Sequence, residues 1–78
     1  MTQSHISIKL FATLRTYTPE QSDSFPVRPG TTIRDLIEQL GVPEEEVRLI
    51  FVDGIKGELT SPLKGGERVG IFPPVGGG

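Results

Sequence analysis

The sequence predicts an α+β fold, in which one main helix packs across a mixed sheet of about four to five strands. Three segments indicate this. Residues 6–11 and 67–72 alternate apolar and polar side chains, as strands with one buried face do. Residues 32–40 repeat apolar side chains at helical spacing. The chain has 78 residues, and a chain this short buries only about 60% of its unfolded surface. We therefore expect one domain with one core.

The composition excludes several classes of protein. Hydrophobic residues make up 35% and charged residues 23% of the chain, values typical of globular proteins. The longest apolar run, 49–52, is far below the roughly 20 residues of a membrane helix. The net charge is -2 with scattered basic residues, and there is no cysteine, so we expect neither nucleic-acid binding nor thiol chemistry. Residues 1–5 do not resemble a secretory signal, which predicts a cytoplasmic location.

The first strand is predicted at residues 6–11. Residues 12–23 are predicted to form an irregular or helical turn and then a loop, with Ala12, Leu14 and Tyr17 packed inward. Residues 25–27 alternate again. Pro26 lacks a backbone N–H, which favours an edge strand or a strand end.

The helix is predicted at residues 32–40. Thr32 and Asp35 have the spacing of a capping box, with aspartate in place of glutamate. Gly41 is expected to end the helix. The apolar positions of this helix recur three or four residues apart: Ile33, Leu36, Ile37 and Leu40.

The second half of the chain is predicted to return to the sheet. Residues 43–47 suit a short helical turn that begins with proline and acids. Residues 48–52 form a strand, and Asp53-Gly54 is a hairpin signal that leads into residues 55–56. Gly65-Gly66 then turns the chain into a last strand at 67–72.

This element order predicts a ubiquitin-like β-grasp. Two opening strands joined by a hairpin, a helix across them and strands that return beside the first describe that topology. We expect a domain over residues 1–72 and an extended, flexible Pro-Pro-Val-Gly-Gly-Gly tail over residues 73–78.

The tail is the candidate functional site. Pro73 and Pro74 favour extended geometry and end the strand ladder. The six residues from Pro73 to Gly78 span at most about 20 Å, enough to enter a partner's active site. Glycines let the backbone pass a narrow channel, and a terminal carboxylate on Gly78 is anionic at neutral pH and able to attack the α-phosphate of ATP. The alternative is a frayed end without function.

Phe72 is the second informative residue. If Val69 and Ile71 point into the core, Phe72 points to the opposite face of the sheet. There it either anchors a partner or folds back over the sheet.

The residues also match a family. Phe11-Ala12-x-Leu14-Arg15, Val52-Asp53-Gly54 and the segment from Leu63 to Gly78, with its Phe-Pro-Pro-Val, resemble the MoaD/ThiS sulfur carriers. The resemblance is closest to the small subunit of molybdopterin synthase, whose members typically have alanine where this chain has Gly76.

The resemblance implies a more specific function than the residues alone indicate. It implies that an E1-like enzyme of the MoeB/ThiF type uses ATP to adenylate Gly78, and that a sulfur donor, such as a cysteine desulfurase or rhodanese, converts it to a thiocarboxylate. The carrier then binds a large subunit of the MoaE type and gives sulfur to a pterin intermediate. No cofactor is expected to be bound, and the chain is expected to be a sulfur-donor subunit without catalytic side chains of its own.

By the same resemblance, Gly78 is the reactive position, and the expected partner-binding residues precede it: Phe72, Pro73, Pro74, Val75, Gly76 and Gly77. The alternatives are a carrier for thiamine, cysteine, tungsten-pterin or tRNA thiolation, a ubiquitin-like protein modifier, or a plain interaction module.

Overall fold

The structure, a computed structural model, describes residues 4–74. The tail positions Val75, Gly76, Gly77 and Gly78 therefore lie outside the described residues. The elements are β1 (Ser4–Leu10), η1 (Ala12–Tyr17), β2 (Phe25–Val27), α1 (Ile33–Leu40), η2 (Glu44–Glu46), β3 (Leu49–Val52), β4 (Ile55–Lys56) and β5 (Arg68–Phe72), where η marks a 3-10 helix. This order confirms the predicted β-grasp, with boundaries shifted by up to two residues.

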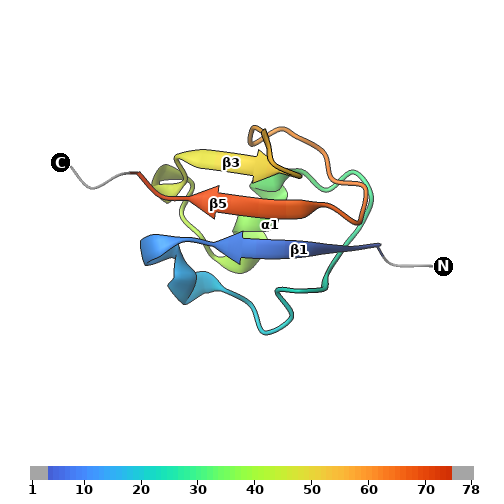
Figure 1. Ribbon diagram of the computed structural model, residues 1–78, viewed down its shortest axis with the longest axis horizontal. Helices are drawn as coiled ribbons and strands as arrows, with labels where there is room; N and C mark the ends of the chain where they lie inside the picture. The colour runs from blue at the N-terminus through green and yellow to red at the C-terminus, as the bar shows by residue number, and fades with distance from the viewer. Residues whose placement is uncertain (1–3, 75–78) are drawn as a thin grey trace.

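The strands form one mixed sheet in the order β2-β1-β5-β3-β4 (Figure 1). β5 lies in the centre, parallel to β1 and antiparallel to β3. β1 begins at Ser4, earlier than predicted, because Ser4 pairs with Val27 of β2. β1 and β2 are antiparallel neighbours, but η1 and a loop connect them in place of the predicted hairpin.

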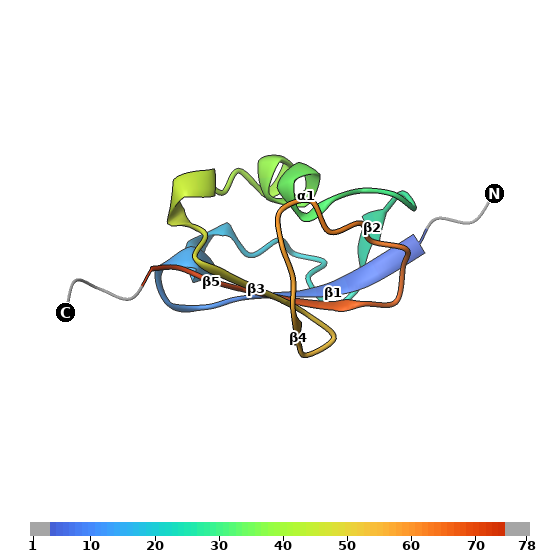
Figure 2. The same ribbon diagram turned by 90° about the horizontal axis from the view of Figure 1, so that it is seen from above.

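The helices of residues 4–74 lie on one face of the sheet (Figure 2). None of them covers the other face, which we call the open face. α1 starts at the predicted capping box, in which Thr32 and Asp35 exchange hydrogen bonds, and ends at Gly41 in the left-handed conformation. Its apolar stripe packs on the inner face of β1, β3 and β5. The fully buried side chains that fill this core are Ile6, Leu14, Ile33, Leu36, Ile37, Leu63, Val69 and Ile71.

The three positions after β1 that were predicted to pack inward differ in outcome. Leu14 is buried and Tyr17 packs against the core, as predicted. Ala12 is exposed, so the prediction for Ala12 was wrong. The reason is local: Ala12 has φ 53, which turns the chain out of β1 and directs its methyl group to solvent.

No helix within residues 4–74 is long and apolar enough to cross a membrane.

Candidate functional site

The last described residues form a firmly held tail root, which we define as Ile71 to Pro74. Ile71 is completely buried. Its carbonyl accepts a hydrogen bond from Phe11 N on one side, at 3.1 Å, and the Phe72 carbonyl accepts one from Arg48 N on the other, at 2.8 Å. Pro73 is half-buried and Pro74 is exposed. Because prolines have no N–H, the sheet ladder ends at Phe72, and the tail leaves from a fixed point.

The Phe72 side chain lies on the open face of the sheet, opposite Val69 and Ile71, as predicted. Its ring stacks on Phe11 with centroids 4.1 Å apart and planes 3° apart. Phe51 meets it edge-on, with centroids 5.7 Å apart. Phe72 is therefore folded over the sheet, yet it belongs to an aromatic cluster that no helix of residues 4–74 covers.

The three rings border a shallow apolar hollow of about 260 Å³. Gly70, which pairs with Lys9 of β1 and Phe51 of β3, forms its floor. A Cβ placed on Gly70 would lie 3.5 Å from Phe11 and 3.9 Å from Phe72. The missing side chain thus leaves the space between the rings. The hollow is lined by Lys9, Phe11, Phe51, Gly54, Arg68, Val69, Gly70 and Phe72.

The charged residues that line this hollow, Lys9 and Arg68, are both cations. Lys9 Nζ lies 5.9 Å from the centre of the Phe11 ring, within reach of a cation–π interaction. Lys56 pairs with Phe51 and so points to the same face. The nearby Asp53 carboxylate accepts a hydrogen bond from Arg68 N at 2.9 Å, which fixes the β3–β4 turn against β5.

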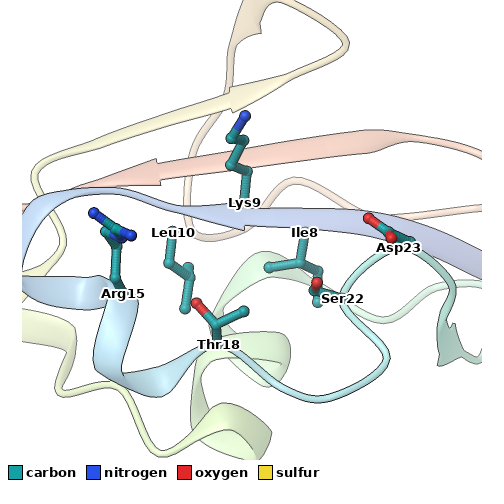
Figure 3. Close-up of a pocket in the computed structure, with 7 residues that line it drawn as sticks. All are labelled: Ile8, Lys9, Leu10, Arg15, Thr18, Ser22 and Asp23. Atoms are coloured by element: carbon teal, nitrogen blue, oxygen red, sulfur yellow. The ribbon is translucent and has the colours of Figure 1, made fainter.

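A second, larger cavity of about 460 Å³ lies between β1, η1 and the loop after η1 (Figure 3). Thr18 and Ser22 offer hydroxyls there, and Asp23 stands at one end. Figure 3 shows the Lys9 side chain pointing away from it, across the sheet. Since neither Phe72 nor the prolines line this cavity, it is separate from the tail root.

The described residues offer no metal site: residues 4–74 hold no group of three His, Cys, Asp or Glu side chains placed to bind an ion. The predicted site residues Phe72, Pro73 and Pro74 are adjacent at the end of β5. The roles predicted for them and for the tail beyond them remain predictions.

Sequence reasoning missed Phe51 and Gly70 as parts of the same surface. Phe51 was placed in a strand, but its partners depend on β3 pairing with β5, a long-range contact. The sequence did contain a signal: each of the three predicted strands 6–11, 48–52 and 67–72 has a phenylalanine at a position that alternation assigns to the outer face of the sheet, namely Phe11, Phe51 and Phe72.

The comparisons with known proteins agree with this fold. The sequence matches the family described as Mut7-C ubiquitin over residues 3–76. No curated protein matches the chain. Among solved structures, the Pyrococcus furiosus protein named "putative molybdopterin converting factor, subunit 1" is 28% identical with a TM-score of 0.63, and the match covers 92% of this chain and 99% of that chain.

Two proteins from Haloferax volcanii share the fold. Small archaeal modifier protein 1 is 21% identical with a TM-score of 0.66, and the match covers 92% of this chain and 99% of that chain. The HVO 2177 protein is 22% identical with a TM-score of 0.74, and the match covers 97% of this chain and 88% of that chain. The predicted resemblance to MoaD-like, ubiquitin-like proteins is thus confirmed, and the chain belongs to the Mut7-C ubiquitin family.

Proposed function

We propose that this protein is a sulfur carrier whose Gly78 carboxylate is adenylated, converted to a thiocarboxylate and used as the sulfur source in molybdopterin biosynthesis. The observation that supports the proposal most strongly is that the backbone of the tail root is held in place by hydrogen bonds. Phe11 N and Arg48 N hold the carbonyls of Ile71 and Phe72 from both sides, and Pro73-Pro74 follow at once. A segment of Val-Gly-Gly-Gly after such an anchor suits entry into a partner's active site.

The chemistry needs no catalytic side chain from this protein. A carboxylate oxygen of Gly78 attacks the α-phosphorus of ATP, and pyrophosphate leaves with the electron pair of the broken P–O bond. A sulfide equivalent from the donor then adds to the acyl carbon, and AMP leaves. The carboxyl carbon keeps its oxidation state throughout, so sulfide itself requires no oxidant or reductant. A persulfide on the donor instead forms an acyl disulfide with release of AMP, and a thiol then attacks that disulfide, releasing the thiocarboxylate and forming a new disulfide.

The choice of molybdopterin as the destination rests on two facts. The Phe-Pro-Pro-Val segment resembles the small subunit of molybdopterin synthase, and the similar Pyrococcus furiosus protein carries a molybdopterin converting factor name. The partners proposed are an E1-like adenylating enzyme of the MoeB/ThiF type, a sulfur donor and a large subunit of the MoaE type. A ubiquitin-like modifier is the second candidate, because small archaeal modifier protein 1 has the same fold.

The test is reconstitution with the activating enzyme and the large subunit of the same organism. The protein is incubated with the activating enzyme, ATP and a sulfur donor, and the intact mass is measured. We expect exchange of one oxygen for sulfur, which the large subunit and the pterin precursor then consume. An unchanged mass under conditions that activate a known carrier would contradict the proposal. Isopeptide adducts to lysines would favour the modifier.

A deletion of Gly77 and Gly78 supplies the matched control. The shortened chain still ends in glycine, at Gly76, but reaches about 7 Å less far. We expect it to fold like the parent and to remain unadenylated. Full adenylation of the shortened chain would show that reach from the tail root is irrelevant.

A further inference from the structure

The outer edge of β1, which faces away from β5, is covered for only part of its length. β2 pairs with the segment from Ser4 to Ile6. The loop after η1 follows at Ile8, whose N–H donates to Ser22 O at 2.7 Å. Beyond Ile8, no element of residues 4–74 pairs with this edge. The cavity of about 460 Å³ between β1, η1 and the loop lies here (Figure 3), and we call it the edge cavity.

Leu10 presents an unpaired stretch of backbone at the edge cavity. The N–H and C=O of one strand residue point to the same side, and the side alternates along the strand. Ser7 N and Phe11 N donate on the β5 side, whereas Ile8 N donates to the loop, so both backbone groups of Leu10 face the loop side. Within residues 4–74 neither group has a hydrogen-bond partner. Leu10 is only 4% exposed, and buried backbone groups normally have partners. The pair of groups therefore indicates a ligand.

Opposite charges stand at the two ends of the edge cavity. Figure 3 shows Arg15 at the Leu10 end and Asp23 at the other end, with the side chains of Thr18 and Ser22 between them. Arg15 and Asp23 are exposed, and neither makes an ion pair within the part of the chain that the structure describes. A ligand with a carboxylate at one end and an ammonium group at the other would pair with both.

We propose that the edge cavity binds a free tripeptide in extended form, which runs parallel to β1 with its amino group at Asp23 and its carboxylate at Arg15. The length follows from the strand. Asp23 lies beside Ser7, because its carbonyl accepts a hydrogen bond from Ser7 Oγ at 3.3 Å. From Ser7 to Leu10 the strand rises by about 10 Å, which is also the length of three extended residues. This site is independent of the proposed sulfur transfer.

Parallel pairing determines which groups of the tripeptide meet Leu10. In a parallel ladder, a residue donates to a carbonyl and accepts from an amide that lie on either side of the residue opposite it. With the second peptide residue opposite Leu10, the Leu10 N–H donates to the first carbonyl, and the Leu10 C=O accepts from the third N–H. The second N–H points away from β1. Addition of a strand to a sheet edge is a common mode of peptide recognition.

Other ligands match the edge cavity less well. Its volume is within the 300–1,000 Å³ of small-ligand pockets, but no aromatic side chain lines it for a nucleobase, and the Asp23 carboxylate would repel phosphate. A single amino acid carries both charges on one carbon, too close together to reach both ends. The carboxyl end of a longer chain would pair with Arg15 but would leave Asp23 without a cation.

The experiment titrates the ¹⁵N-labelled protein with trialanine, which has free termini, and follows the amide signals by NMR. We expect saturable shifts at residues of the edge cavity. We also expect the Leu10 amide proton to exchange about tenfold more slowly at a trialanine concentration about ten times the dissociation constant. No saturable shift at a concentration on the order of 50 mM, where even weak ligands bind, would overturn the proposal.

Two methylated probes test the backbone pairing. A methyl group on the third nitrogen of trialanine removes the N–H that Leu10 C=O accepts. A methyl group on the second nitrogen makes the same chemical change at an N–H that faces away from β1, and is the matched control. We expect the first probe to bind about tenfold more weakly than the second. Equal affinities of the two methylated probes would overturn the parallel arrangement and with it the proposal.

Substitutions test the two charged ends. Arg15→Gln and Asp23→Asn each remove one charge, and Arg28→Gln and Glu38→Gln remove matching charges from exposed side chains outside the edge cavity. We expect about fivefold weaker binding of trialanine for each of the first two and less than about a twofold change for the controls. Thermal unfolding verifies that every variant folds. Parent-like affinity of Arg15→Gln and Asp23→Asn would contradict the proposal.

An acetylated probe separates the free peptide from the end of a longer chain. Acetylation of trialanine removes the ammonium group and keeps the carboxylate, and we expect it to weaken binding to the parent by about fivefold but to leave binding to Asp23→Asn within about twofold. Equal affinity of acetylated and free trialanine for the parent would overturn the proposal, because the edge cavity would then bind carboxyl ends in general.

Discussion

At the scale of single residues, Phe72 both stabilises the sheet and is the residue from which the tail begins. Its backbone closes the ladder between β5 and β3 through the Arg48 N–H. Its ring closes the aromatic cluster with Phe11 and Phe51. The sequence predicted the face on which Phe72 lies, because alternation along a strand is a local property. It could not predict the two rings that Phe72 meets, since Phe51 comes from β3 and Phe11 from the residue that follows β1.

We predict that Phe72→Ala lowers the free energy of unfolding by about 2 kcal/mol. The ring is half-buried, so the cost is below the 3–5 kcal/mol of a fully buried phenylalanine, but two aromatic contacts are lost as well. Urea unfolding measures this. Ile55→Ala is the control, because Ile55 is 72% exposed, and we expect a change below about 0.5 kcal/mol. Equal effects of the two substitutions would contradict the assigned role of the cluster.

At the scale of the elements, the helix was the most predictable part of the fold. The apolar spacing, Thr32, Asp35 and Gly41 are all local signals, and the structure confirms each of them. The parallel pairing of β1 with β5 is not local, because the paired residues are 61 positions apart in the sequence, as in Ser7 and Arg68. The hydrogen bonds that attach residues 57–64 to the start of α1, through Ser61 O and Leu59 O, are also long-range, so the sequence could not predict them.

Removing the cap should destabilise α1 measurably. Thr32→Ala removes the hydroxyl that accepts from Asp35 N at 3.2 Å, and we expect a loss of about 1 kcal/mol. Thr60→Ala, on an exposed threonine outside the helix, should cost less than about 0.5 kcal/mol. Chemical unfolding of both variants tests this. A Thr32→Ala protein as stable as the parent would show that the capping box does not support the helix.

The turn before β5 offers a second test at this scale. Gly65 has φ 128, and a Cβ there would lie 2.5 Å from Ser4 Cβ. Gly66 also has a positive φ, of 85, but its Cβ would meet nothing within 4 Å. Both alanine substitutions carry backbone strain of order 1–3 kcal/mol, and Gly65→Ala adds a steric clash at the pairing of β1 with this turn.

We therefore expect Gly65→Ala to be less stable than Gly66→Ala by at least about 1 kcal/mol. The midpoints of urea unfolding compare the two variants directly. If Gly66→Ala were the less stable one, the close approach of Gly65 to Ser4 would not be a determinant of the fold.

At the scale of the whole molecule, the domain has two unlike faces. The helices lie on one face of the sheet (Figure 2). Of these helices, α1 and η2 carry acidic side chains, and the aromatic hollow with its cations lies on the other face. Composition suggested only a slightly acidic globular protein with scattered basic residues. The separation of charge arises from folding, which brings Lys9, Lys56 and Arg68 from three strands to one face. The tail root lies at the end of β5, on the border of this open face.

The central claim is that Gly78 carries the reactive group. The most direct measurement is tandem mass spectrometry of the C-terminal peptide of the protein purified from its own organism, under conditions that demand molybdopterin. The account predicts a population of chains that end at Gly78 and carry sulfur in place of one carboxyl oxygen on that residue. Chains that continue past Gly78, or that end there with only oxygen while molybdopterin is being made, would contradict it.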